Sequence, residues 1–143
     1  MTDINKSPSH YIGIGASAGG LEALQEFFSH LPCTTGAAFI VVQHLSPDFK
    51  SMMPELLSKH TKMPIYQVVD GMSLESNCIY LMPARKNMLI GEGKLLLSDE
   101  MPSAQSRMPI DIFLRSLAED QQHKAIAIVL SGTGSDGTRG IKS

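Results

Sequence analysis

The chain has 143 residues, which suits one domain with a substantial core, and its composition is that of an ordinary globular protein. The net charge is −2, with acidic and basic residues intermixed, so nothing indicates a nucleic-acid-binding surface. The longest apolar runs are too short to span a bilayer, and residues 1–10 lack the apolar core of a signal peptide. We therefore expect a flexible leader over 1–10 and one cytoplasmic domain over 11–143.

Apolar strands and amphipathic helices alternate in the first half of the chain. The expected elements are a strand at 11–15, a helix at 19–30, a strand at 38–43 and a helix at 48–60. The two strands are continuous apolar runs, which are typical of a parallel sheet covered on both faces. In the first helix, Leu21, Leu24 and Phe28 fall on one face. In the second, Pro54 is tolerated only near the start.

The second half adds further strands, a hairpin and the clearest helix. The expected elements are strands at 65–69 and 78–82, a β-hairpin of 87–90 and 94–98 around the sequence GEG, a polar loop at 99–108, a helix at 110–122, a buried strand at 125–130 and a helix that begins at Thr138. The helix at 110–122 is predicted by apolar residues at i, i+3, i+4, i+7 and i+8: Ile110, Phe113, Leu114, Leu117 and Ala118.

This alternation predicts an α/β fold in three α/β/α layers. The expected architecture is a doubly wound, largely parallel sheet with helices on both faces and a β-hairpin. Residues 138–143 offer barely one helical turn, which is not stable alone, so we expect the natural domain to continue past Ser143. An unfinished sheet would expose an edge and apolar surface, which favours self-association.

Three loops with reactive side chains are expected at one edge of this sheet. Ser17 follows the first strand, His44 follows the second and Asp136 follows the last. The carboxyl ends of parallel strands line the ligand crevice of such a fold. A serine, a histidine and an aspartate there are the parts of a nucleophilic triad, in which Ser17 attacks, His44 transfers the proton and Asp136 orients the imidazole.

The glycines around Ser17 suit this role. The sequence GASAG at 15–19 matches the G-x-S-x-G pattern of a nucleophile elbow, and Gly15 and Gly19 permit a tight turn and close helix-to-strand packing. Backbone N–H groups at the helix start, beginning with that of Ala18, are candidate oxyanion donors. Thr133 and Gly134 in the facing loop are candidates for a further donor.

Other interpretations remain open from the residues alone. Ser17 also suits a helix cap, His44 a hydrogen-bonded strand-end histidine, and Asp136 a turn before a glycine. The sequence G-x-G-x-x-A, from Gly13 to Ala18, partly matches a dinucleotide-binding fingerprint. However, the acidic residue that this fingerprint requires after the second strand is missing.

Neither a metal nor a phosphate-binding loop is indicated by the sequence. No P-loop sequence occurs, and the remaining histidines form no metal-ligand pattern with a second histidine or cysteine. Cys33 and Cys78 are expected to be reduced and structural. We therefore expect no cofactor.

Taken together, four motifs resemble the catalytic domain of the chemotaxis protein-glutamate methylesterase (CheB-type) family. They are GIGASAGG, VVQHLSPDF, IYLMPARKNMLI and VLSGTGSDGTRG, and the resemblance runs from about Tyr11 to the last residue. The stretch MPIDIFLRSLAED resembles the versions that are fused to a receptor methyltransferase. The family domain continues beyond the Asp-Gly motif, so the resemblance implies that this chain is truncated at its C-terminus.

The resemblance implies an activity and its partners. The activity is hydrolysis of glutamyl methyl esters on chemoreceptor cytoplasmic helices to glutamate and methanol, with glutamine deamidation as a further reaction. Ser17 is implied as nucleophile, His44 as base and Asp136 as third member, with no metal or organic cofactor. The implied partners are methylated receptor cytoplasmic domains and a fused methyltransferase domain, without nucleic acid or direct membrane insertion.

The chain departs from the family pattern at several places. Ala18 stands where the chemotaxis enzymes often have threonine, and Thr133 stands where many have methionine, although a backbone donor would survive that change. With only ten residues before Tyr11 here, we do not expect phosphorylation control through the family's receiver domain. Arg107 and the LSP sequence after His44 are candidate substrate contacts, although Arg107 also suits a solvated loop charge.

A second hypothesis belongs to another functional class. The chain would be a non-catalytic, receptor- or partner-binding module of a fused signalling protein, which predicts binding without turnover. Dinucleotide binding, the third hypothesis, predicts stabilisation by a dinucleotide.

Overall fold

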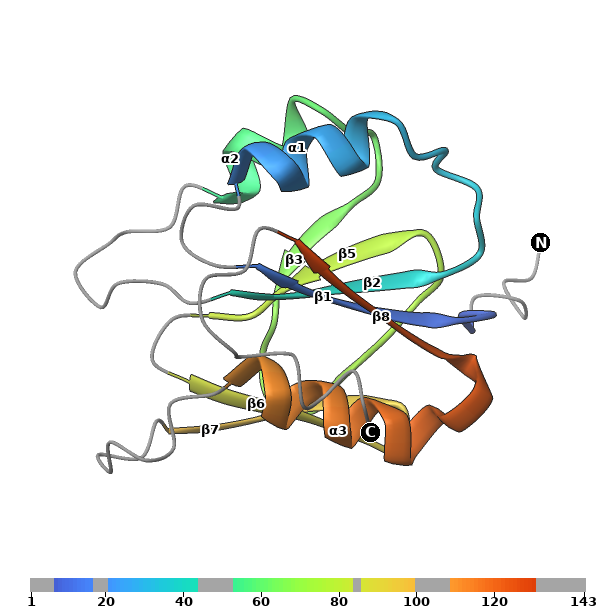
Figure 1. The fold of residues 1–143 in the computed structure, drawn as a ribbon, viewed down its shortest axis with the longest axis vertical. Coiled ribbons are helices and arrows are strands. Elements are labelled where there is room, and N and C mark those ends of the chain that lie inside the picture. Colours follow the sequence, from blue (N-terminus) through green and yellow to red (C-terminus); the bar gives the residue numbers. More distant parts are fainter. Residues whose placement is uncertain (1–6, 17–20, 44–52, 84–85, 100–108, 131–143) are drawn as a thin grey trace.

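The computed structural model of the chain describes residues 7–16, 21–43, 53–83, 86–99 and 109–130. At its centre is a five-stranded sheet in which all neighbouring strands are parallel (Figure 1). Its strands, in the order β3-β5-β2-β1-β8, are β3 (Ile65–Gln67), β5 (Cys78–Leu81), β2 (Ala38–Gln43), β1 (Tyr11–Ala16) and β8 (Ala125–Leu130). The predicted parallel α/β sheet is therefore confirmed.

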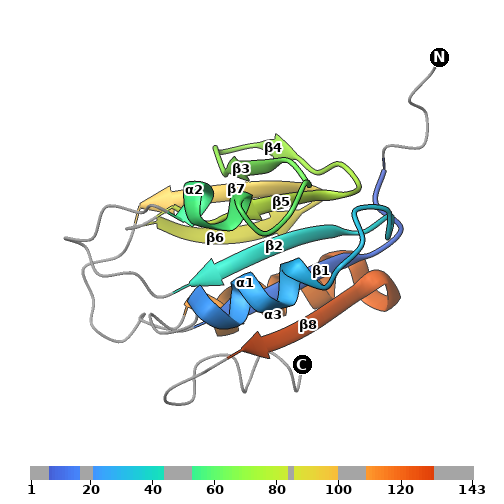
Figure 2. The ribbon, with the colours of Figure 1, turned by 90° about the horizontal axis from the view of Figure 1, so that it is seen from above.

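The two faces of this sheet are covered differently, as Figures 1 and 2 show. Helices α1 (Leu21–Ser29) and α2 (Met53–Ser58) cover one face. The other face carries helix α3 (Pro109–Gln121) beside a small antiparallel sheet of β4 (Met72–Ser73), β7 (Lys94–Asp99) and β6 (Lys86–Gly91). The third layer is thus a helix and a hairpin sheet together, and a short 3-10 turn (Gln122–Lys124) leads from α3 into β8.

Each face of the sheet has its own apolar cluster. On the α1 side, Leu24 and Phe28 pack with Ile14 of β1 and Phe39 of β2, and the rings of Phe28 and Phe39 meet edge-to-face at 5.6 Å. The second cluster joins the sheet to α3 and the hairpin through buried residues that include Ile40, Met88, Leu95, Phe113 and Leu117. The apolar stripe predicted for α3 therefore faces the core, as its helical spacing indicated.

Some sequence predictions need correction. The strand at 125–130 was expected to be buried, but Ile126 is 41% exposed, because β8 pairs only with β1 within the described residues and so forms an edge. The strand expected at 65–69 ends at Gln67, and Val69 is 59% exposed. Strand β4 and the 3-10 turn were not predicted, since two or three residues carry no detectable periodicity. The loop expected at 99–108 starts one residue too early, because Asp99 is the last residue of β7. Residues 100–108 and the helix start expected at Thr138 lie outside the described residues.

The predicted hairpin is present, with a two-residue turn. Gly91 pairs with Lys94, and the intervening Glu92 and Gly93 have φ values of 52° and 74°, which is the sign pattern of a type I′ turn. Asp120, near the end of α3, accepts hydrogen bonds from both turn N–H groups, at 2.6 Å from Glu92 and 3.0 Å from Gly93. The carboxylate therefore ties the hairpin turn to the helix.

We expect Asp120→Ala to lower the free energy of unfolding by about 1 kcal/mol at neutral pH, because the carboxylate loses its two hydrogen bonds to the hairpin turn and the one from the Gln121 side chain, all at a largely solvated site. Burial tends to raise the pKa of Asp120, but hydrogen bonds from Gly93, Gln121 and Glu92 outweigh it and hold this pKa below its ordinary value. Because this pKa is lower in the folded state than in the unfolded state, the ionised carboxylate stabilises the fold at pH values above the unfolded-state pKa. The stabilisation is lost as the pH falls through the folded-state pKa. Urea unfolding at pH 7 and at about pH 2.5 measures both effects.

The neighbouring Glu119→Ala is the control, since Glu119 is exposed. An equal loss of stability in both variants, or a loss in Asp120→Ala that stays constant down to about pH 2.5, would contradict the role assigned to the Asp120 carboxylate.

Within the described ranges, no helix combines the length and the apolar character needed to cross a membrane.

Candidate functional site

Three strands end side by side at one edge of the main sheet. In the strand register, Ala16 of β1 lies between Gln43 of β2 and Leu130 of β8, and each of the three is the last residue of its strand. Adjacent strands are about 4.8 Å apart, so the chain leaves the sheet at three neighbouring points. Figure 2 shows β2 and β8 pointing toward this edge, which we call the carboxyl edge.

The predicted site residues follow these strand ends in the sequence. Ser17 comes directly after Ala16 and His44 directly after Gln43, and Asp136 comes six positions after Leu130. All three lie outside the described residues, as do the candidate oxyanion donors Ala18, Thr133 and Gly134 and the candidate substrate contact Arg107. Their roles therefore remain predictions, and the structure describes the sheet from which their loops begin.

The glycines of β1 allow helix α3 to pack closely against the strand. A Cβ atom on Gly15 would lie 2.5 Å from Cγ2 of Ile110, and one on Gly13 would lie 2.9 Å from Cδ2 of Leu114. These distances are too short for real Cβ contacts, so a side chain at either position would force the α3 side chains opposite it, or the helix itself, to shift. Gly15 is thus closely approached by α3, which comes nearly a hundred residues later in the sequence, whereas the close packing was expected from the helix that directly follows Ser17.

This packing also bears on the dinucleotide interpretation. Gly13 and Gly15 were the first two glycines of the partial fingerprint, and the face that lacks side chains is occupied by Leu114, Leu117 and Ile110 of the protein itself. Two of the glycines therefore have a structural explanation that requires no nucleotide. Together with the missing acidic residue after β2, this weakens the dinucleotide hypothesis.

Helix α3 begins at the carboxyl edge. Ile110, near the start of α3, packs against Gly15 near the end of β1. Leu117, two turns later in the helix, packs against Gly13, which is two residues earlier in the strand. The helix therefore runs away from the carboxyl edge. Asp111, which follows Ile110, is only 4% exposed. Asp111 and Gln43 are the two buried polar side chains within the described part of the chain.

The sequence did not predict these two buried polar groups. An acidic residue such as Asp111 is favoured in the first turn of a helix, so nothing in the sequence indicated its burial beyond its place between the apolar Ile110 and Leu114. Gln43 ends a continuous apolar strand, which in retrospect indicates that its side chain is covered. Both belong to elements that end or begin at the carboxyl edge.

The shifted pKa values of the described residues have structural causes. Burial, followed by the nearby carboxylate of Asp120, raises the pKa of Tyr11, the first residue of β1. Burial also raises the pKa of Tyr80, whose hydroxyl accepts a 2.8 Å hydrogen bond from the N–H of Glu75. Both tyrosines therefore stay protonated at neutral pH. Among the described residues, no cluster of three or more His, Cys, Asp or Glu side chains is arranged to hold a metal ion.

Comparison with known proteins is consistent with this arrangement. The family model described as CheB methylesterase matches residues 12–143. A Bacillus licheniformis protein named protein-glutamate methylesterase/protein-glutamine glutaminase is 32% identical over 135 residues, which cover 92% of this chain and 38% of that protein. A Xanthomonas euvesicatoria protein with the same name, numbered 1, is 31% identical over 140 residues, covering 95% of this chain and 39% of that protein.

A solved structure has the same fold. The crystal structure of the Thermotoga maritima CheB methylesterase catalytic domain is 28% identical in sequence and superposes with a TM-score of 0.79. The match covers 94% of this chain and 75% of that one. The chain thus spans most of a catalytic domain in this comparison, but less than two fifths of the Bacillus licheniformis relative, at 38%.

Proposed function

The chain belongs to the CheB methylesterase family, and from this premise we propose that it forms the catalytic part of a protein-glutamate methylesterase. The proposed reaction is hydrolysis of glutamyl methyl esters on the cytoplasmic helices of chemoreceptors, which releases methanol. The observation that best supports it is the register-aligned row of Gln43, Ala16 and Leu130, because the segments with His44, Ser17 and Asp136 begin there.

The proposed mechanism is acyl transfer through Ser17. Its Oγ attacks the ester carbonyl while His44 takes the hydroxyl proton, and backbone N–H groups stabilise the oxyanion that forms. His44 then returns the proton to the departing methoxide, so methanol leaves and a glutamyl–Ser17 ester remains. Water attacks this ester with His44 again as base, which releases glutamate and restores the serine.

The chain length after β8 is compatible with this triad. Strand β8 is separated from β2 by β1 alone, so the two strand ends are about 10 Å apart. Six residues in extended form reach about 20 Å. Asp136 can therefore reach the loop that begins at the end of β2, where it would hold the His44 imidazole.

A second reaction is suggested by the relatives, whose printed names include protein-glutamine glutaminase. The same acyl–Ser17 intermediate would form from a glutamine side chain, with ammonia as the leaving group in place of methanol. Protonation of the leaving nitrogen by His44 is then required, since an amide anion is a far poorer leaving group than methoxide. Both reactions would take place on receptor domains in the cytoplasm.

Methanol release from methylated receptor membranes tests the proposal. The chain is assayed by itself and within the complete open reading frame that encodes it, with Ser17→Ala as the matched control in each case. We expect release that depends on Ser17, together with a glutamyl adduct on Ser17 after rapid acid quenching. Receptor binding without any methanol release from the folded protein would refute the esterase and favour a non-catalytic binding module.

A further inference from the structure

Helix α3 places a buried carboxylate at the carboxyl edge, and the proposed triad does not use it. Asp111 lies in the first turn of the helix and is only 4% exposed. The other acidic residues of α3 lie near its far end, where Glu119 is exposed and Asp120 holds the hairpin turn. A carboxylate removed from water is costly unless hydrogen bonds or a counter-charge replace the lost hydration. The burial of Asp111 therefore calls for an explanation.

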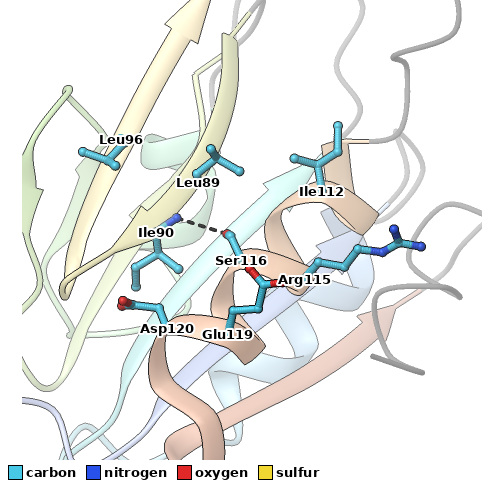
Figure 3. A pocket seen from close by; sticks show the side chains of 8 residues that line it. All are labelled: Leu89, Ile90, Leu96, Ile112, Arg115, Ser116, Glu119 and Asp120. Carbon is cyan, nitrogen blue, oxygen red and sulfur yellow. Dashed lines mark hydrogen bonds between the residues drawn. The ribbon is translucent and has the colours of Figure 1, made fainter.

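The contacts of its neighbours show which side of α3 carries Asp111. The hydroxyl of Ser116 accepts a 3.1 Å hydrogen bond from the N–H of Ile90, so Ser116 faces the hairpin (Figure 3). Ile110 faces β1. Successive residues of a helix are about 100° apart around its axis, so Asp111 lies about 100° from Ile110 in one direction and Ser116 about 120° in the other. Asp111 therefore faces away from the hairpin.

This flank of the helix lies under the end of β8. The hairpin shares its apolar cluster with Tyr80 of β5 and Ile40 of β2, whereas α3 packs against β1 and also contacts β8. In the sheet, β8 follows β1 on the side away from β2, so β8 and the hairpin lie on opposite flanks of α3 (Figure 2). Asp111 thus occupies the flank on which β8 ends at Leu130.

The other buried polar side chain of the described residues lies on the opposite face of the sheet. Side chains alternate along β2, and Phe39 and Val41 belong to the cluster on the α1 side. Gln43 follows the same alternation and faces that side. The sheet therefore separates Gln43 from Asp111, and neither group accounts for the burial of the other.

The sequence that begins at the end of β8 suits a buried carboxylate. Residues 131–137 read SGTGSDG, in which three of seven residues are glycine. Successive backbone N–H groups of glycine-rich segments converge readily on an anion, because no side chains obstruct the approach. The same segment contains Asp136 and the candidate oxyanion donors Thr133 and Gly134.

We propose that Asp111 is a positioning residue of the esterase, whose carboxylate accepts hydrogen bonds from backbone N–H groups of residues 131–137. This inference rests on the proposed function, in which that segment supplies Asp136 and an oxyanion donor. Asp111 touches neither the substrate nor the reacting atoms, and it acts only through the segment that it holds. Firm support matters there, because a displacement of about 1 Å in a catalytic group can cost about 10²-fold in rate.

A purely local role for Asp111 makes different predictions. A carboxylate in the first helical turn also stabilises its own helix, through hydrogen bonds to the first N–H groups and through the helix dipole. In that case its removal lowers stability and loosens the start of α3, but the rate of the folded enzyme stays the same. The experiments below are designed to separate the two roles.

The first experiment measures amide hydrogen exchange in wild-type protein and Asp111→Ala. We expect the amides of residues 131–137 to exchange about tenfold faster or more in the variant, relative to those of β1. Leu114→Ala is the matched control, since Leu114 is buried one turn further along the same helix and its removal destabilises through a cavity. This control should not accelerate residues 131–137 selectively. Faster exchange confined to residues 108–112 would overturn the proposal.

The second experiment measures steady-state kinetics with a methylated receptor fragment and with the γ-methyl ester of N-acetylglutamate amide. We expect Asp111→Ala to lower kcat about 10-fold to 100-fold for both substrates, with KM within about twofold, since the loss concerns the transition state. Asp111→Asn keeps one acceptor oxygen and should recover part of the rate. In Leu114→Ala, kcat should stay within about twofold of the wild-type value.

The double variant of Asp111→Ala with Asp136→Ala shows whether Asp111 acts through the segment after β8. Its rate should be higher than the product of the two single losses predicts, because both changes affect the same segment. Fully multiplicative losses would contradict the proposal, and so would an equal loss of kcat in Leu114→Ala.

An unchanged kcat in folded Asp111→Ala would overturn the proposal, and if this variant does not fold, an unchanged kcat in Asp111→Asn has the same meaning. Failure of the wild-type protein to hydrolyse either ester would instead refute the proposed function. The exchange experiment does not depend on activity, so it would still show whether Asp111 holds residues 131–137.

Discussion

Ser17→Ala should lower methanol release by about 10⁴-fold or more, the range found when a triad nucleophile is removed from a serine hydrolase. Alanine has no oxygen to form the acyl intermediate, so only the oxyanion donors and substrate binding would still contribute. The affinity for methylated receptor should change little, because binding does not require the hydroxyl. Methanol release and receptor binding are measured on the same preparations.

The other proposed members of the triad give the prediction its internal test. His44→Ala should reduce the rate about as strongly as Ser17→Ala, and the double variant should be no slower than either single variant, because the two residues act as one unit. Asp136→Ala should cost about 10-fold to 100-fold less than Ser17→Ala, since it acts only through the imidazole. Multiplicative losses in the double variant would contradict the assignment.

A serine elsewhere in the chain controls for the substitution itself. Ser29 is exposed at the end of α1, and its hydroxyl donates a 2.9 Å hydrogen bond to the carbonyl of Glu26. Ser29→Ala should keep essentially the full rate of methanol release. Circular dichroism on every variant separates a loss of catalysis from a loss of fold.

The largest expected effect on stability is at Gly15. In Gly15→Ala the new Cβ would lie 2.5 Å from Cγ2 of Ile110, so the Ile110 side chain or the helix that carries it must shift, which costs about 1–3 kcal/mol of unfolding free energy. Gly15→Val adds two more methyl groups at the same contact and should cost about 3 kcal/mol or more. Gly15 is not among the glycines with positive φ, so the penalty is steric and not conformational.

A double-mutant cycle isolates this contact. Ile110→Ala alone should destabilise by about 2–5 kcal/mol through the cavity that it leaves. Combined with Gly15→Ala, the total loss should be smaller than the sum by about 1 kcal/mol or more, because the new methyl group enters that cavity. Urea denaturation of the four proteins supplies the values.

Gly91→Ala is the matched control, since a Cβ there would lie at an ordinary 3.5 Å from Leu96 and the residue has no positive φ. It should change the unfolding free energy by about 0.5 kcal/mol at most. If Gly15→Ala is no more destabilising than Gly91→Ala, the close packing of α3 on β1 is wrong.

The two glycines also show how far the sequence could predict the candidate site. The G-x-S-x-G pattern indicated a tight approach at Gly15, but the same letters were compatible with a nucleotide loop. Only the packing of Ile110 and Leu114 against β1 shows what lies opposite the missing side chains. The roles of Ser17, His44 and Asp136 come from pattern and family resemblance, and the strand register supplies their neighbouring starting points.

Local features determined much of the fold. Continuous apolar runs predicted β1, β2 and β8, helical spacing predicted the buried face of α3, and GEG predicted the hairpin, because each depends on residues close together in the chain. The family motifs are local in the same sense, so both the fold class and the family could be predicted from the chain alone.

Features that depend on segments far apart in the chain could not be predicted in this way. The order β3-β5-β2-β1-β8 places Ala16 between Gln43 and Leu130. Local periodicity cannot predict this order, because it depends on the path of the crossover connections between the strands. The same holds for the burial of Asp111, which depends on the packing of α3 against the sheet. Side-chain surroundings are properties of packing, so they appear only when the sheet and its layers assemble.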